Sequence, residues 1–182
     1  MSGGGPTPLM VEQQVRGKTG ERRALYSVLA ARFAGGTEAQ IVAYERAACA
    51  FGIARQLGSD CLDLFADPEA GRDLKNGTRT WPIATWLEGE DTRSERVAAL
   101  ERACVSVAAR IEVCRRMVAD GVIERTSARI EFWRAQAHAE LVNAKRSAEG
   151  GFGLRRMIDA CRLDQRLLID RVGTAESTNA VG

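Results

Sequence analysis

Proline is confined to positions 6, 8, 68 and 82, and this distribution limits what the chain can fold into. Proline interrupts a helix because it lacks a backbone N–H and its ring clashes with the preceding turn. Helix is therefore permitted from Leu9 to Asp67, and again from Ile83 to the end. Neither stretch contains an alternating apolar and polar run bounded by turn residues, the pattern typical of a strand. We expect an all-α fold in which about six helices pack as a bundle.

Glycines and capping residues divide the first stretch. Gly35-Gly36 is typical of a helix end, because glycine adopts the left-handed backbone conformation at little cost. Thr37 followed by Gln40 matches a capping box, in which each side chain accepts a hydrogen bond from the other residue's backbone N–H. The pattern predicts a helix from this point to Asp67.

The strongest periodic signal follows Thr92 and Glu95, which repeat the capping-box spacing. Apolar residues then recur at alternating intervals of three and four, which places them along one stripe of a single long helix. They are Val97, Leu100, Cys104, Val107, Ile111, Cys114 and Val118. Asp120-Gly121 is expected to end this helix.

Two more helices are expected in the C-terminal part of the chain. The first runs from Ile123 to Lys145 and ends at Gly150-Gly151, and the second spans about Leu154 to Arg171.

Length and composition favour a single folded domain. The chain has 182 residues, of which 45% are hydrophobic, enough for one substantial core. Residues 1–8 form a Gly- and Pro-rich lead and residues 173–182 a tail of small residues, and we expect both to fray. The folded domain is predicted to span residues 9–172.

Charge and cysteine content exclude several classes of protein. The net charge of +2 offers no general field for binding nucleic acid or an anionic membrane. No stretch reaches the length of a membrane span, and no export signal is recognised, so we expect a soluble, cytoplasmic protein. The cysteines form no Cys-x-x-Cys pair and are expected to be reduced core thiols rather than zinc ligands. They are Cys49, Cys61, Cys104, Cys114 and Cys161.

One helical face of the segment from Phe51 to Ile83 carries polar residues suited to chemistry. On a helix, spacings of four, four, three and four bring together Gly52, Gln56, Asp60, Asp63 and Asp67. Carboxylate pairs at such spacing suit Mg²⁺, which commonly bridges a protein to a substrate diphosphate. Spacing alone favours a simpler interpretation, in which these are solvated charges on an exposed face.

The order and spacing of residues in the whole segment resemble the second aspartate-rich region of the trans-isoprenyl diphosphate synthases. In that family a helix of the form Gly-x-x-x-Gln-x-x-Asp-Asp-x-x-Asp precedes a loop ending Gly-x-Asp-Leu-x-x-Gly-Lys-x-Thr-x-Pro. The helix residues here are Gly52, Gln56, Ser59, Asp60 and Asp63, and those of the loop are Gly71, Asp73, Leu74, Gly77, Thr78, Thr80 and Pro82.

Two further matches extend the resemblance from about Val11 to about Arg171. Upstream, Gly17-Lys18-Thr19-Gly20 resembles the family's Lys-Thr motif. Downstream, the run from Asp120 to Leu141 resembles its C-terminal helices. The resemblance implies the all-α isoprenoid (terpenoid) synthase fold.

What the resemblance implies for function is Mg²⁺-dependent transfer of an allylic prenyl group from its diphosphate onto isopentenyl diphosphate. Asp60 and Asp63 would be the metal ligands. Lys18 would contact the allylic diphosphate, Thr19 would lie beside the prenyl chain, and Gln56 would shape the same wall. These three are the candidate catalytic and substrate-binding residues.

Departures from the family pattern leave alternatives open. Ser59 replaces the first aspartate of the motif, Thr78 replaces a lysine, and Arg22 and Arg23 stand where the family usually has apolar residues. The first aspartate-rich motif has no counterpart, so the chain is expected to work as a homo- or hetero-oligomer with a prenyl synthase subunit that supplies it. The alternatives are a non-catalytic regulatory or small subunit and an inactive truncated remnant.

Overall fold

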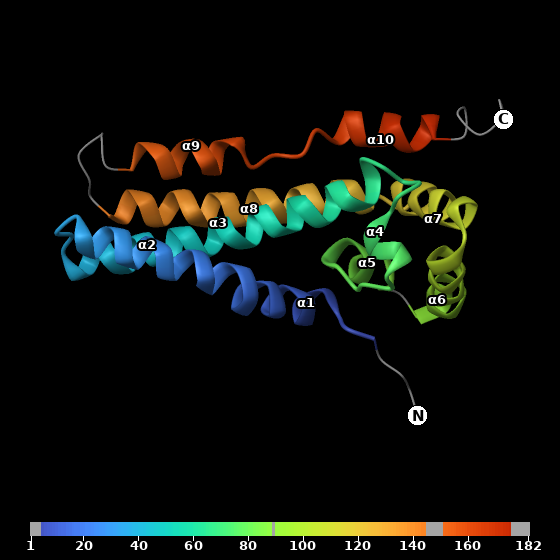
Figure 1. Ribbon diagram of the computed structural model, residues 1–182, viewed down its shortest axis with the longest axis horizontal. Coiled ribbons are helices and arrows are strands. Elements are labelled where there is room, and N and C mark those ends of the chain that lie inside the picture. Colours follow the sequence, from blue (N-terminus) through green and yellow to red (C-terminus); the bar gives the residue numbers. More distant parts are fainter. Residues whose placement is uncertain (1–4, 89, 145–150, 176–182) are drawn as a thin grey trace. The chain divides into compact units, whose positions relative to one another are not determined.

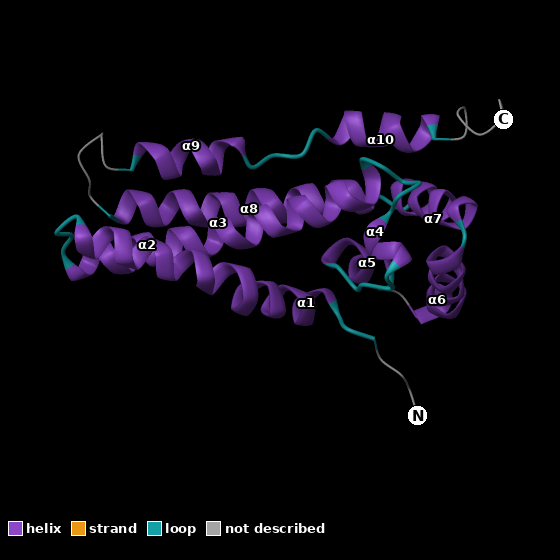
Figure 2. Ribbon diagram, in the orientation of Figure 1, coloured by secondary structure: helices purple, strands orange, loops and turns teal. Residues whose placement is uncertain are grey.

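The computed structural model describes residues 5–88, 90–144 and 151–175 (Figure 1). These residues form helices joined by loops, and no strand occurs among them, which confirms the all-α prediction (Figure 2). None of the described helices combines the length and the apolarity needed to cross a membrane.

The described part of the chain contains ten α-helices and one π-helical turn, more than the six expected. Their bounds are α1 Pro8–Val15, η1 Arg16–Gly20, α2 Glu21–Phe33, α3 Glu38–Phe65, α4 Arg72–Lys75, α5 Trp81–Trp86, α6 Glu90–Val105, α7 Val107–Ala119, α8 Val122–Asn143, α9 Phe152–Ala160 and α10 Gln165–Thr174.

Contacts between residues divide the chain into two compact units, each built from several segments. Unit 1 comprises residues 1–11, 59–127 and 163–182, and unit 2 comprises residues 12–58 and 128–162. The 9–172 domain boundary stays a prediction.

The start of α3 follows the predicted capping box. The Thr37 N–H donates to Gln40 Oε1 at 3.0 Å, and the Gln40 N–H donates to Thr37 Oγ1 at 3.3 Å. The end of α3 differs from the prediction, because the helix stops at Phe65 and excludes Asp67. The residue before a proline avoids the helical region, and Asp67 instead accepts a hydrogen bond from the Ala70 N–H at 3.1 Å.

The single long helix expected up to Val118 is two helices, α6 and α7. Ser106 interrupts them with an extended backbone, and its hydroxyl accepts the Ala109 N–H at 3.3 Å as the N-cap of α7. The predicted cap at Thr92 is also wrong, because α6 begins two residues earlier at Glu90. A serine next to helix ends competes for backbone bonds, and apolar periodicity does not register this.

Buried Arg110 secures the break between α6 and α7. Its guanidinium donates to the Ala103 carbonyl near the end of α6 at 3.1 Å and to the Glu69 carbonyl at 2.9 Å. One side chain thus satisfies a carbonyl near the end of α6, which the ended helix leaves without a partner, and a carbonyl of the turn before α4.

The C-terminal helices also differ from the sequence pattern. Gly121, with φ of +72°, precedes α8, as predicted. Lys145 and Gly150 lie outside the described residues. The helix expected over 154–171 is interrupted between α9 and α10, because the Asp164 side chain caps α10 by accepting the Leu167 N–H at 3.0 Å.

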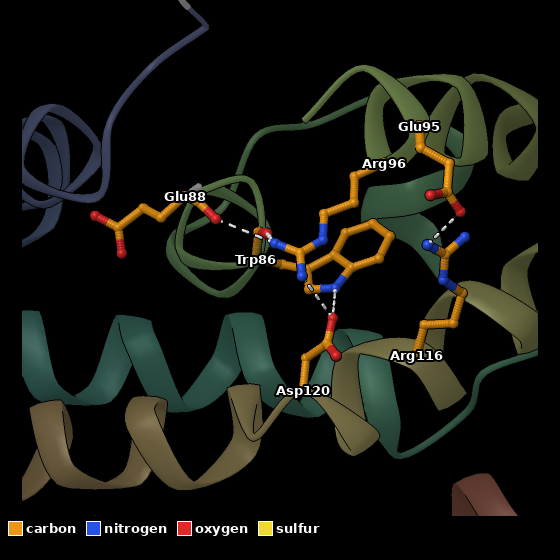
Figure 3. Close-up of polar contacts among 6 residues, drawn as sticks. All are labelled: Trp86, Glu88, Glu95, Arg96, Arg116 and Asp120. Atoms are coloured by element: carbon orange, nitrogen blue, oxygen red, sulfur yellow. Dashed lines mark hydrogen bonds and ion pairs between the residues drawn. The ribbon is translucent and has the colours of Figure 1, made fainter. Parts of the chain in front are cut away.

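The core of unit 1 is centred on Trp86, whose side chain is fully buried. Its indole Nε1 donates to Asp120 Oδ2 at 2.8 Å, while the guanidinium groups of Arg96 and Arg116 lie 5.4 and 5.6 Å from the ring centre (Figure 3). Arg96 also donates to the Trp86 carbonyl at 2.6 Å. These contacts hold α5 against α6 and α7.

The core of unit 2 lies between α3, α8 and α9 and is built around small residues, which let these helices approach closely. At its edge, buried Glu12 of α1 accepts two hydrogen bonds from Arg129 of α8, both at 2.6 Å. Trp133 Nε1 donates to the same carboxylate at 3.1 Å. This bidentate pair fastens α1 to α8.

Candidate functional site

Lys18 and Thr19 lie in the π-helical turn η1 between α1 and α2. The turn is closed by a hydrogen bond from the Glu21 N–H to the Arg16 carbonyl, five residues apart. Lys18 is exposed, whereas Thr19 is buried. The irregular backbone coincides with the Lys-Thr motif of the sequence. Single π-turns inside helices occur frequently at functional sites.

A close approach between η1 and α3 positions the buried threonine. A Cβ added to Gly52 would lie 3.1 Å from the Gly20 Cα and 3.2 Å from the Thr19 carbonyl oxygen. With glycine at that point, the Thr19 hydroxyl donates to Gln56 Oε1 at 3.3 Å. Two of the three predicted substrate-contact residues are therefore joined within unit 2.

The predicted metal ligands Asp60 and Asp63 lie three residues apart in the last turns of α3, in unit 1. Asp60 is buried, with a relative exposure of 6%, and Asp63 is exposed. The two carboxylates thus have different surroundings, which spacing alone did not indicate.

Asp73 on α4 is a third carboxylate of this region. Its pKa is raised, first by burial and then by the negative charge of Asp63, so the two groups are close enough to interact. Like charges brought together in this way favour a bound divalent cation. Asp73 belongs to the loop motif in the sequence, but the motif alone indicates no role for it.

Gly71 turns the chain so that α4 lies next to α3. Its φ is +38°, and an added Cβ would lie 3.1 Å from Arg110 Cδ and 3.2 Å from the Pro68 carbonyl oxygen. Asp67 belongs to this turn rather than to the carboxylate face. Asp60 and Asp63 of the predicted acidic face lie on α3, and Asp73 of α4 is close enough to Asp63 to interact with it.

The donor set suits Mg²⁺ as part of a larger site. Within residues 5–88, 90–144 and 151–175, no three His, Cys, Asp or Glu side chains gather as a complete metal site. Mg²⁺ usually takes one or two carboxylates and completes its shell with waters and substrate phosphates. The oxygens of Asp63 and Asp73 fit that description.

Comparison with known proteins identifies the family of the chain. A family model described as Polyprenyl synthetase matches residues 10–117, which include the Lys-Thr motif, α3 and the loop through Asp73. The chain belongs to the polyprenyl synthetase family. Members of this family have the all-α isoprenoid synthase fold and act as prenyltransferases in isoprenoid biosynthesis.

The matched segment covers residues 10–117 of the chain. The match ends before Asp120, so the resemblance of the C-terminal helices stays a prediction. No curated protein and no solved structure matches the chain.

Proposed function

We propose that this member of the polyprenyl synthetase family takes part in Mg²⁺-dependent transfer of an allylic prenyl group onto isopentenyl diphosphate, together with a polypeptide that carries further metal-binding carboxylates. In this reaction the allylic C–O bond breaks and its electron pair leaves with the diphosphate. The double bond of isopentenyl diphosphate forms the new C–C bond, and a proton is lost. The interaction between Asp63 and Asp73 supports the proposal most directly.

Asp60 and Asp63 are assigned as metal ligands, with Asp73 beside them. Bound Mg²⁺ would supply positive charge where the leaving diphosphate becomes more negative. Because Asp73 is half-buried next to Asp63, the pair carries an electrostatic cost that a cation relieves.

Lys18, Thr19 and Gln56 are assigned to the substrate. The exposed Lys18 ammonium is a compact cation suited to binding a diphosphate. Thr19 and Gln56 hold each other through their hydrogen bond, so they offer a fixed wall beside the prenyl chain.

An exposed apolar stripe on α2 supports the requirement for a partner. Leu25, Leu29 and Phe33 follow one another at intervals of four and are 56%, 44% and 91% exposed. Residues at this interval share one helix face, and an apolar face of this kind is typical of a protein–protein contact. We propose that a prenyl synthase subunit, either a second copy or a different chain, covers it.

A non-catalytic subunit is the second candidate function. Ser59 and Thr78 favour it, because a serine and a threonine replace an aspartate and a lysine of the family motif. Such a subunit would dock through α2 without contributing to the diphosphate site.

The test is a prenyl-transfer assay on the complex purified from its native host. Under the catalytic proposal, Lys18→Ala and the double variant Asp60→Ala/Asp63→Ala abolish transfer while the complex still assembles. Glu112→Ala, which removes an exposed carboxylate of α7, serves as the matched control and keeps activity. Full activity in the Lys18 and aspartate variants would leave only the docking function.

A further inference from the structure

Unit 2 contains a cavity of about 450 Å³ between α2, α3 and α9. Its walls are mostly apolar, and its lining includes Ala30, Ala48, Phe51, Leu154 and Met157. The volume lies in the range of small-molecule sites, which commonly combine apolar walls with a few polar groups. The residues assigned above to metal and substrate do not line it.

Arg23 brings a charged group into this apolar lining. Its guanidinium lies 5.2 Å from the centre of the Phe51 ring. The Nε–H is buried and has no hydrogen-bond partner, and no carboxylate among the described residues pairs with the side chain. A buried donor without an acceptor costs free energy, and a ligand acceptor would remove that cost.

Two other arginines act on the charge of Arg23. Its pKa is lowered, first by burial and then by the positive charges of Arg55 and Arg22. The Cys161 thiol acts in the opposite direction on the Arg23 pKa, but burial raises its own pKa, so it is a weak source of negative charge. No carboxylate is among the groups that shift the Arg23 pKa.

We propose that the cavity binds an amphiphile with one apolar chain and an anionic head, held by the Arg23 guanidinium. The apolar walls take the chain, and the buried Nε–H donates to the head, which is a carboxylate or a phosphate monoester. This site shares no residue with those proposed to act in prenyl transfer, and it needs no metal.

Calorimetry on the full chain in EDTA tests the proposal, with decanoate and geranyl monophosphate as probes. At least one of them is expected to bind at one site, and the tighter probe identifies the head group. Arg23→Met, which keeps a long apolar side chain, weakens binding about tenfold or more. Arg32→Met, which removes an exposed arginine of the same helix that does not line the cavity, leaves binding unchanged. Decyltrimethylammonium, which has the same chain length as decanoate and a cationic head, does not bind.

A cavity-filling variant provides an independent test. Ala30 is exposed on α2 and lines the cavity, so Ala30→Trp blocks the cavity and abolishes binding while Arg23 remains. Thermal unfolding checks the fold, and Arg23→Met is expected to be at least as stable as the unliganded native chain because it loses the unpaired donor.

The experiment tests this binding site independently of the prenyl-transfer proposal. Asp60→Ala/Asp63→Ala is expected to bind the anionic probe as the native chain does. The inference is overturned if neither probe binds saturably, if Arg23→Met binds as tightly as the native chain, or if the cationic probe binds equally well.

Discussion

The Cα of Gly20 lies 3.1 Å from the point that a Cβ on Gly52 would occupy, so η1 and α3 meet where neither residue has a side chain. This contact brings Thr19 within hydrogen-bond distance of Gln56. The arrangement of two candidate substrate residues therefore depends on a glycine that makes no polar contact through a side chain.

Gly52→Ala is expected to destabilise the fold by about 1–3 kcal/mol, since the added methyl group overpacks backbone atoms. Gly58→Ala, in the same helix, is the matched control. Its added Cβ would meet only Ile130 Cδ1, at 3.8 Å, so the better helix propensity of alanine should stabilise the fold by about 0.5–1 kcal/mol. Denaturant unfolding of both variants measures the difference. Equal effects of the two substitutions would contradict the close approach.

Asp63→Asn is expected to lower the pKa of Asp73. Burial is the larger cause of the raised pKa and remains in the variant, so the pKa should fall only part of the way to its usual value. Carboxyl carbon shifts recorded against pH by NMR follow this change. Saturating Mg²⁺ should also lower the pKa of Asp73 in the native chain. A pKa that responds to neither change would show that Asp63 and Asp73 do not share a site.

Removal of Arg129 is expected to destabilise unit 2 in a pH-dependent manner. Burial raises the pKa of Glu12, but hydrogen bonds from Arg129 and Trp133 outweigh it, and the net pKa lies below the usual 4.5. A carboxyl with a lowered pKa contributes stability above its unfolded-state pKa and loses that contribution as the pH falls through the folded value.

Arg129→Met should therefore reduce the free energy of unfolding by about 2 kcal/mol at pH 7, between the values for surface and buried pairs. The difference from the native chain should shrink as the pH falls from 4.5 through the lowered pKa of Glu12 in the folded chain. Urea unfolding at pH 7 and pH 3 makes the comparison. The assignment fails if the difference is the same at both pH values.

Cys61 and Cys114 are expected to resist alkylation in the folded chain. Both thiols are fully buried, and burial raises the pKa of each to about 12, so neither forms thiolate at pH 8. Mass spectrometry after iodoacetamide treatment should find Cys104, which is partly exposed, modified before them. In guanidinium all three should react at similar rates. Rapid modification of Cys61 in the folded chain would contradict its packing.

Local signals predicted the helix boundaries that depend on neighbouring residues. The capping box at Thr37 and the stop at Gly121 both lie where the sequence placed them. The breaks at Ser106 and Asp164 were missed, because apolar periodicity continues across them while a single polar side chain caps a new helix.

The candidate site was predictable to the extent that its parts form short motifs. The pairing of Thr19 with Gln56 follows from residues that the family resemblance had already singled out. The interaction of Asp73 with Asp63 depends on the turn at Gly71, and the spacing of residues along one helix cannot indicate a contact between two elements. The π-helical turn at Arg16–Gly20 has no comparable local signal.

The π-helical turn makes the rotation of α1 relative to α2 depend on the number of residues between them. A π-turn holds one residue more than an α-turn, and each residue of an α-helix turns the chain by about 100°. Deleting Gly17, whose added Cβ would meet nothing within 4 Å, would let α1 and α2 join as one regular helix. Glu12 would then rotate away from Arg129. The extra residue of the π-turn therefore sets the rotation of α1 about the helix axis relative to α2.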